Sequence, residues 1–142
     1  MRALLRLSDW MRHKARLRTW NTAHAWGRRG EDLAHRYLQS KGYRIVARNL
    51  MLRGAHVEID LVARHAGVIV FVEVKTRATD EFGTPDRAVD PEKRENLARA
   101  ASAYLHAAGS TWDQARFDIV SVTFDPRVRI QHIQDAFPLP SL

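Results

Sequence analysis

Hydrophobic residues follow two different periods along this chain, and the changes from one period to the other mark the expected elements. Runs rich in β-branched and aromatic residues are typical of strands, and apolar residues three and four positions apart are typical of helices. Strands are expected at residues 43–50, 57–64, 68–76, 116–124 and 127–133, and helices at residues 23–40 and 91–107. The core order, α-β-β-β-α-β, predicts an α/β fold with a mixed central sheet flanked by helices.

The central strand carries the most informative polar residues. Its unbroken apolar run, residues 68–72, leads directly into Glu73-Val74-Lys75. Side chains alternate along a strand, so Glu73 and Lys75 share one face, roughly 7 Å apart. An acid and an amine at the end of a buried strand cost free energy unless they have partners or a chemical role. A salt-bridged sheet edge is the alternative to a functional pair.

The preceding strand, residues 57–64, alternates clearly between apolar and acidic positions. One face holds Val57, Ile59, Leu61 and Ala63, and the other holds Glu58, Asp60 and Val62. A short turn with a glycine joins it to the central strand, which can bring Glu58 and Asp60 beside Glu73 and Lys75. Three carboxylates near one lysine repel each other unless a cation lies among them. The pattern therefore predicts a metal site.

Helix boundaries carry local signals. Thr22 is expected to cap the first helix, and Gly42 is expected to end it. Asp90-Pro91 is typical of a helix start, with the aspartate as cap and proline at the first helical position. Glu31 lies on the first helix, where an isolated acid is usually solvated.

Composition narrows the function classes. The 142 residues, 45% hydrophobic and 27% charged, suffice for one globular domain with a core. The sequence has no cysteine, which excludes disulfides, thiolate zinc sites and a cysteine nucleophile and fits the reducing cytoplasm expected for it. No apolar run reaches membrane-spanning length, so an integral membrane segment is not expected.

Positive charge is concentrated at the N-terminus. Residues 1–20 hold six basic residues against one acid, a charge of +5 within the net +7 of the chain. We expect residues 1–21 to form a basic arm, 22–137 the domain and 138–142 a tail. The arm could contact phosphates, pack on the domain or lie on a membrane surface. The candidate nucleic-acid contacts are Arg12, Lys14, Arg16, Arg18, Arg28, Arg29, Arg77, Lys93 and Arg94.

Several motifs between residues 24 and 137 recur together in one known family. They are Gly27-x-x-Gly30-Glu31-Asp32-x-Ala34, Glu58-Ile59-Asp60-Leu61-Val62-Ala63, Phe71-Val72-Glu73-Val74-Lys75-Thr76-Arg77, Phe82-Gly83-x-Pro85, Phe117-Asp118 and His132-Ile133-x-Asp135-Ala136-Phe137. With them the chain resembles the YraN family of uncharacterised bacterial proteins, which look like members of the restriction-endonuclease-like and Holliday-junction-resolvase superfamily. Val57, where the family commonly has glycine, and a longer turn before Glu58 depart from the pattern.

The resemblance implies a restriction-endonuclease-like core and a metal-dependent nuclease acting on DNA, including branched or junction DNA. Asp60 and Glu73 would bind Mg²⁺, with Mn²⁺ as a substitute. Lys75 would orient or help deprotonate the attacking water and offset charge in the transition state. Glu31 would reach the outer shell or a second metal, and Glu58 is a secondary ligand.

Two other functions stay open at this point, because fold and function separate readily. One is a nucleic-acid-binding protein of the same fold that does not cleave. The other is a structural or partner-binding domain whose acids and lysine form an ionic network. A homodimer is also among the assemblies left open. Strand alternation would put His56 on the same face as Asp60, but we interpret it as a solvated loop residue. Convergence of the acids and Lys75 in one cleft would favour the nucleic-acid functions.

Overall fold

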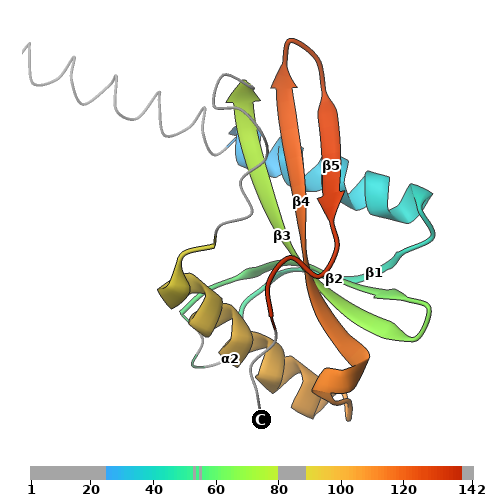
Figure 1. The fold of residues 1–142 in the computed structure, drawn as a ribbon, viewed down its shortest axis with the longest axis vertical. Coiled ribbons are helices and arrows are strands. Elements are labelled where there is room, and N and C mark those ends of the chain that lie inside the picture. The colour runs from blue at the N-terminus through green and yellow to red at the C-terminus, as the bar shows by residue number, and fades with distance from the viewer. Residues whose placement is uncertain (1–24, 53, 55, 80–88, 139–142) are drawn as a thin grey trace, which may run out of the picture.

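The computed structural model describes residues 25–52, 54, 56–79 and 89–138. Residues 25–40 are helical, and the strands that follow are β1 (Arg44–Leu50), β2 (Ile59–His65) and β3 (Val68–Thr79). Helix α2 (Pro91–Ala107) and the 3-10 turn η1 (Trp112–Gln114) lead to β4 (Ala115–Asp125) and β5 (Arg129–Ile133) (Figure 1). The predicted α/β fold with a mixed sheet is confirmed, and it is compatible with a restriction-endonuclease-like α-β-β-β-α-β core.

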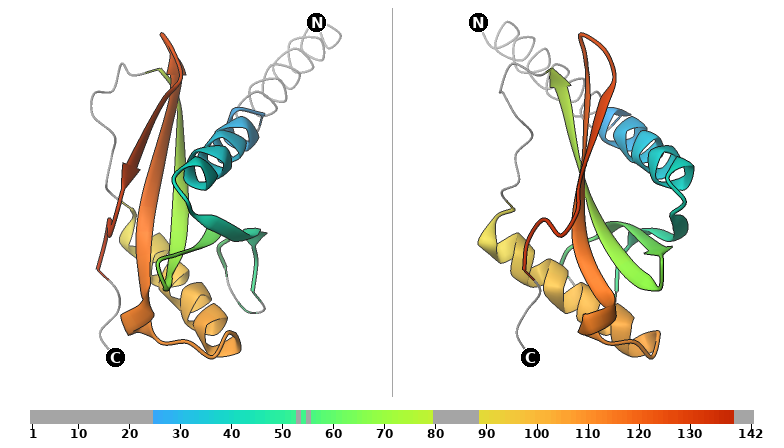
Figure 2. Two further views of the ribbon diagram at one scale, coloured as in Figure 1. Left: turned by 90° about the vertical axis from the view of Figure 1, so that its right-hand side faces the viewer. Right: turned by 45° about the vertical axis from the view of Figure 1, so that its right-hand side comes forward.

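The five strands form one sheet in the order β1-β2-β3-β4-β5. Strands β3 and β4 are parallel, and every other neighbouring pair is antiparallel. A parallel pair needs a crossover, which α2 supplies. The first helix and α2 lie on opposite sides of the sheet (Figure 2). The predicted central strand, β3, is therefore the middle of the sheet, covered by a helix on each face.

Alternation along β3 divides the core into two layers. Ile69 and Phe71 pack in the cluster that contains Leu97 of α2, whereas Val70 and Val72 pack with the cluster of the first helix. Odd-numbered residues of β3 thus face α2 and even-numbered residues face the first helix. Glu73 and Lys75 continue the odd-numbered, α2-facing series.

The predicted helix ends agree with the structure where they can be compared. Asp90 caps α2 by accepting a hydrogen bond from the backbone N–H of Glu92 at 2.8 Å, and Pro91 is the first helical residue. Gly42 has a φ of 89°, a left-handed conformation that ends the first helix without a Cβ penalty. Thr22, the predicted cap of the first helix, lies outside the described residues. No helix in the described ranges is long and apolar enough to cross a membrane.

Strand β2 differs from its prediction in both its start and its faces. It begins at Ile59, two residues later than expected. Ile59 packs in the cluster on the α2 side, whereas Leu61 and Ala63, predicted to share its face, pack on the side of the first helix. The pairing of β2 with β3 ends at Leu61↔Val72, while Ile59 still pairs with β1. Beyond the end of that ladder, the backbone at the start of β2 pairs with β1 and not with β3.

Candidate functional site: a carboxylate pair where β2 and β3 separate

Asp60 and Glu73 lie together at the point where β2 and β3 separate. The backbone hydrogen bonds between the two strands end at Leu61↔Val72. Beyond that point a side chain, the carboxylate of Asp60, accepts a hydrogen bond from β3. Its Oδ2 accepts a hydrogen bond from the backbone N–H of Val74 at 2.8 Å. This bond fixes the direction of the Asp60 side chain beside Glu73, as the sequence predicted for these two acids.

The electrostatic surroundings of Asp60 are unusual for an aspartate. Burial and the negative charge of Glu73 raise the pKa of Asp60 to about 7, with a further upward contribution from Glu31. The hydrogen bond from the Val74 amide and the charge of Lys93 act in the opposite direction and are outweighed. Asp60 therefore titrates near neutral pH, which is typical of groups gathered at a functional site.

The two carboxylate oxygens of Glu73 differ in their partners among the described residues. Its side chain is buried, with the residue 6% exposed. Oε1 accepts a hydrogen bond from Nζ of Lys93, which reaches it from the first turn of α2. Oε2 is buried and has no hydrogen-bond partner among the described residues. A buried carboxylate oxygen without a donor is costly, so it is a ready acceptor for a cation or a proton.

Gly30 explains how Glu31 reaches this site from the first helix. A Cβ at Gly30 would come well inside 3.0 Å of Oγ1 of Thr76 on β3. The missing side chain therefore lets the helix approach the strand closely. Glu31, the next residue, has a side chain only 19% exposed and lies 3.7 Å from the guanidinium of Arg48. Its charge contributes to the pKa of Asp60, which places it in the same electrostatic cluster.

Lys75 and Glu58 have different relations to the pair. Lys75 is half-buried, and strand alternation puts it on the same face of β3 as Glu73. Glu58 is exposed, lies before β2 begins and is not among the charges that shift the pKa of Asp60. His56 is also exposed in the preceding loop, as expected. The structure thus groups Glu31, Asp60 and Glu73, with Glu58 outside the group.

The donor set suits a weakly held hard cation better than a closed metal site. Across the described ranges, no three His, Asp or Glu side chains form a compact set of ligands. The unpartnered Oε2 of Glu73 and the raised pKa of Asp60 nevertheless mark two oxygen donors that a cation would stabilise. Mg²⁺ is commonly bound by one or two carboxylates and several waters, which fits this pair.

Comparison with known proteins places these residues in a family. A model described as "Uncharacterised protein family UPF0102" matches residues 30–122, which is more than half of the chain. The chain belongs to the UPF0102 family. A UPF0102 protein of Solibacter usitatus is 50% identical over 111 residues, covering 78% of this chain and 84% of that relative. One of Symbiobacterium thermophilum is 49% identical over 113 residues, covering 78% and 94%.

A third UPF0102 relative, from Geobacter sulfurreducens, is 46% identical over 115 residues, covering 80% of this chain and 88% of that protein. The resemblance to the YraN family is confirmed by these matches. The family match spans Glu31, Asp60, Glu73, Lys75 and Lys93, so the whole carboxylate cluster lies within the part shared with UPF0102.

The basic residues predicted to contact nucleic acid have varied surroundings in this UPF0102 protein. Arg28 is exposed, whereas Arg29 lies over the rings of Trp26 and Phe124, 5.9 and 5.2 Å from their centroids. Arg77 is half-buried, Lys93 contacts Glu73, and the guanidinium of Arg94 lies 5.5 Å from the ring centroid of Phe137. The other four candidates, Arg12, Lys14, Arg16 and Arg18, lie outside the described residues.

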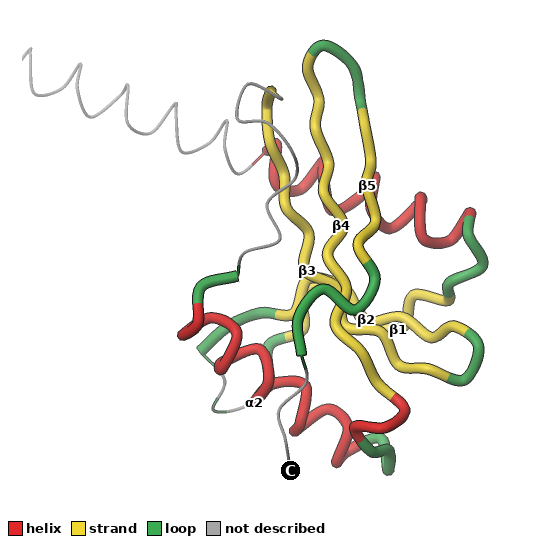
Figure 3. The backbone as a smooth tube through the Cα atoms, in the orientation of Figure 1, coloured by secondary structure: helices red, strands yellow, loops and turns green. Residues whose placement is uncertain are grey.

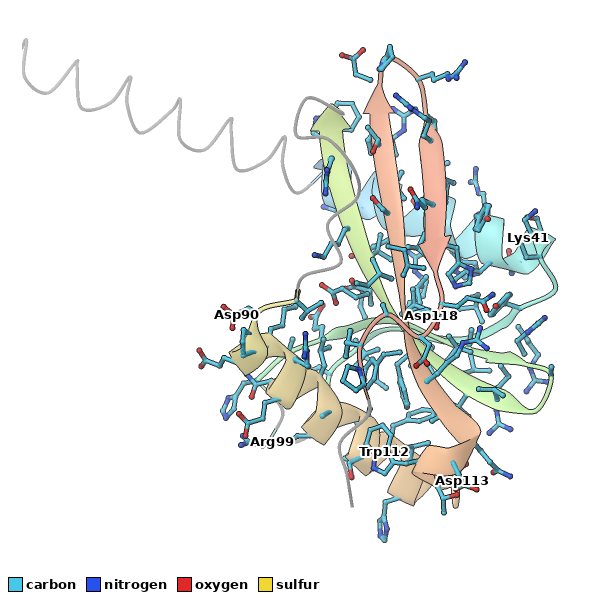
Figure 4. All side chains as sticks on the ribbon, in the orientation of Figure 1. Lys41, Asp90, Arg99, Trp112, Asp113 and Asp118 are labelled. Atoms are coloured by element: carbon cyan, nitrogen blue, oxygen red, sulfur yellow. The ribbon has the colours of Figure 1, made fainter. Side chains whose placement is uncertain are left out.

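A second polar cluster, centred on Asp118 of β4, was missed by sequence reasoning. Asp118 is fully buried and accepts hydrogen bonds from Nε of Arg116 at 2.9 Å and from the backbone N–H of Asp135 at 3.0 Å. Its Oδ2 also lies 2.6 Å from Nε2 of His132 on β5. Figure 4 shows Asp118 near the middle of the molecule. The available signal was an acid between two apolar residues, Phe117 and Ile119, of the predicted strand.

The hydrogen bonds around Asp118 also set its ionisation. Burial alone would raise the pKa of this carboxyl, but the hydrogen bonds from His132 and Arg116 and from the Asp135 amide outweigh it and hold the pKa below its usual value. Asp118 is therefore held in its ionised form at neutral pH, and it ties β5 and the following turn to β4. Its partners satisfy its charge, which indicates a structural role.

Proposed function

We propose that this UPF0102 protein is a metal-dependent nuclease that hydrolyses phosphodiester bonds in DNA, with branched or junction DNA among its substrates. The observation that carries the proposal is the Asp60–Glu73 pair, in which burial and mutual repulsion raise the pKa of Asp60 to about 7. Maintaining two such carboxylates together is costly for folding, and binding a cation and a phosphate offsets that cost.

Each residue of the cluster would have a distinct task. Asp60 and Glu73 would hold Mg²⁺, or Mn²⁺ in its place, which when bound supplies Lewis-acid stabilisation of the phosphate oxygens. The backbone N–H of Val74 keeps Asp60 aimed at the site. Glu31, on the close-packed first helix, would accept hydrogen bonds from water molecules at the site's edge.

Lys75 would act on the reacting phosphate itself. From the Glu73 face of β3 its amine would orient the attacking water and donate a hydrogen bond to the oxygen on which negative charge develops. Hydrolysis forms a bond from the water oxygen to phosphorus and breaks the bond from phosphorus to the leaving oxygen. Such an interaction is strongest in the transition state, so it accelerates the reaction more than it tightens binding.

A cleavage assay on plasmid, single-stranded, flap and four-way DNA with Mg²⁺, Mn²⁺ or EDTA tests this proposal. We expect metal-dependent cleavage by the parent protein and a loss of about 10²–10³ in rate for Lys75→Ala with DNA affinity retained. Asp60→Asn should lose metal binding and cleavage together. Glu95→Gln, which alters an exposed acid on α2, is the matched control and should cleave normally. Absence of cleavage by the parent on all four substrates with both metals would refute the proposal.

A second candidate function, a structural or partner-binding domain, is favoured by the Lys93–Glu73 ion pair. In this pair the ammonium group of Lys93 already neutralises the carboxylate of Glu73. If the cluster is only an ionic network, Mg²⁺ should leave the melting temperature unchanged and Lys93→Ala should unfold more easily with or without Mg²⁺. If the cluster binds metal, Mg²⁺ should raise the melting temperature of the parent and recover part of the loss in Lys93→Ala.

A further inference from the structure

A second concave site lies at the opposite end of β2 from the carboxylates. A pocket of about 400 Å³ is lined by Gly42, Arg44 and the β2–β3 hairpin from Arg64 to Ile69. Figure 3 shows the turn after the first helix and the β2–β3 turn on the same side of the molecule. Arg64 is four residues beyond Asp60, or about 13 Å along the strand. The pocket is thus separate from the candidate nuclease site.

The charges lining this pocket all have one sign. Arg44 and Arg64 are directly opposite each other in the β1–β2 register, and both are exposed. No acidic residue lines the pocket, and among the described residues neither guanidinium has an ion-pair partner. Like charges directly opposite on neighbouring strands repel each other. An anion between the two guanidinium groups would turn that repulsion into attraction.

The pocket wall is held in place from behind. The ring of His65 stacks on that of Tyr43, with centroids 4.1 Å apart and planes 10° from parallel. The Tyr43 hydroxyl accepts a hydrogen bond from Arg116 at 2.7 Å, which links the wall to the buried Asp118 cluster. The rim is a two-residue hairpin turn in which both residues have positive φ, 51° and 79°. The backbone and the aromatic wall of the pocket are therefore ordered before any ligand binds, which lowers the entropy cost of binding.

We propose that this pocket binds a phosphate group, carried by a nucleotide or by a nucleic-acid strand, between Arg44 and Arg64. Guanidinium groups match the geometry of phosphate oxygens and donate paired hydrogen bonds to them. The volume lies within the range of small-ligand sites and leaves room for one nucleotide unit. This proposal does not depend on nuclease activity, because neither arginine belongs to the carboxylate cluster.

Binding of a labelled single-stranded oligonucleotide in EDTA, followed by fluorescence anisotropy over a salt series, tests the site without any cleavage. We expect Arg44→Gln with Arg64→Gln to weaken binding and to lower the slope of log K against log salt by about 0.7, the value for one lost phosphate contact on a single strand. The matched control, Arg99→Gln with Arg127→Gln, removes the same charge from exposed positions elsewhere and should keep the slope. An equal loss in both double variants, or no loss in either, would overturn the proposal.

Amide NMR spectra of the parent protein locate the anion without any substitution. Inorganic phosphate, a mononucleotide and the oligonucleotide are titrated separately, and each should shift the amide of Gly67 at the rim of the pocket. Tighter binding of the oligonucleotide identifies a nucleic-acid strand as the ligand, and equal binding of inorganic phosphate identifies free phosphate. A Gly67 amide that none of the three shifts would overturn the proposal. Melting curves should show the Arg44/Arg64 variant folded, because it relieves a repulsion.

Discussion

Replacing Asp60 with asparagine should stabilise the protein at pH 8. Burial and the charge of Glu73 raise the pKa of Asp60 from 3.8 to about 7, so the folded protein binds this proton more tightly than the unfolded chain. The stabilising contribution of the bound proton is complete below pH 3.8 and is lost as the pH rises through about 7. The difference of about three pKa units corresponds to about 4 kcal/mol at 1.36 kcal/mol per unit.

Asparagine is a close match in shape and can still accept the hydrogen bond from the Val74 amide, but it does not ionise. The Asp60→Asn protein should therefore exceed the parent in unfolding free energy by about 4 kcal/mol at pH 8 and by little at pH 4. At roughly 2–4 °C per kcal/mol for a chain of this size, the melting temperature at pH 8 should rise by about 10 °C. Comparing the two proteins at each pH cancels the titration of the groups that do not interact with Asp60.

Thermal unfolding in EDTA between pH 4 and pH 8, followed by circular dichroism, measures this difference. Asp113→Asn serves as the control, because Asp113 is an exposed aspartate at the far end of α2 from the site (Figure 4). It should give no comparable pH-dependent gain. An Asp60→Asn protein that is no more stable than the parent at pH 8 would refute the electrostatic reasoning. Mg²⁺ should narrow the gap between the two, because it stabilises only the ionised Asp60.

Four further substitutions test the packing and charges around the two clusters. Gly30→Ala should lower the unfolding free energy in urea by about 1–3 kcal/mol because its Cβ has no room, whereas Gly27→Ala, with nothing within 4 Å, should raise it by about 0.5–1 kcal/mol. Lys93→Ala should lower the unfolding free energy at pH 8 by about 2 kcal/mol, because buried Glu73 loses its charged donor. The loss should appear as a lower melting temperature. Asp118→Asn should cost about 3–5 kcal/mol in calorimetry at pH 7. This difference should shrink as the pH falls below 3.8, because the unfolded chain then takes up the proton that the lowered pKa keeps off Asp118 in the folded protein.

Much of the fold could be predicted because local signals determine it. Helix α2 begins and ends where expected, since Asp90 and Pro91 define its start through contacts within one turn. The central position of β3 followed from its unbroken apolar run. The pairing of Asp60 with Glu73 was also accessible, because a tight hairpin joins the two strands and limits their register.

The features that were missed depend on contacts between distant elements. Lys93 was predicted as a nucleic-acid contact from its charge, and nothing in the helical pattern shows that α2 directs it toward Glu73, 20 residues earlier. Ile59 and Leu61 pack on opposite sides of the sheet because the pairing of β2 with β3 stops at Leu61. Alternation along the sequence does not show where that pairing stops. The Asp118 cluster joins β4 and β5 to Tyr43, which lies between the first helix and β1. Local periodicity does not predict contacts between such distant parts of the chain.

The parallel pairing of β3 with β4 also orders the events of folding. Partners from Ile69↔Ala115 to Thr79↔Asp125 stand 46 residues apart in the sequence, whereas the β2–β3 and β4–β5 hairpins close over short turns. Closing a long segment costs more chain entropy, so we expect the hairpins to form before the parallel ladder. The two carboxylates belong to the early β2–β3 hairpin, and Lys93 reaches them only when α2 docks. Until α2 docks, the nascent hairpin therefore carries its acidic pair without that lysine.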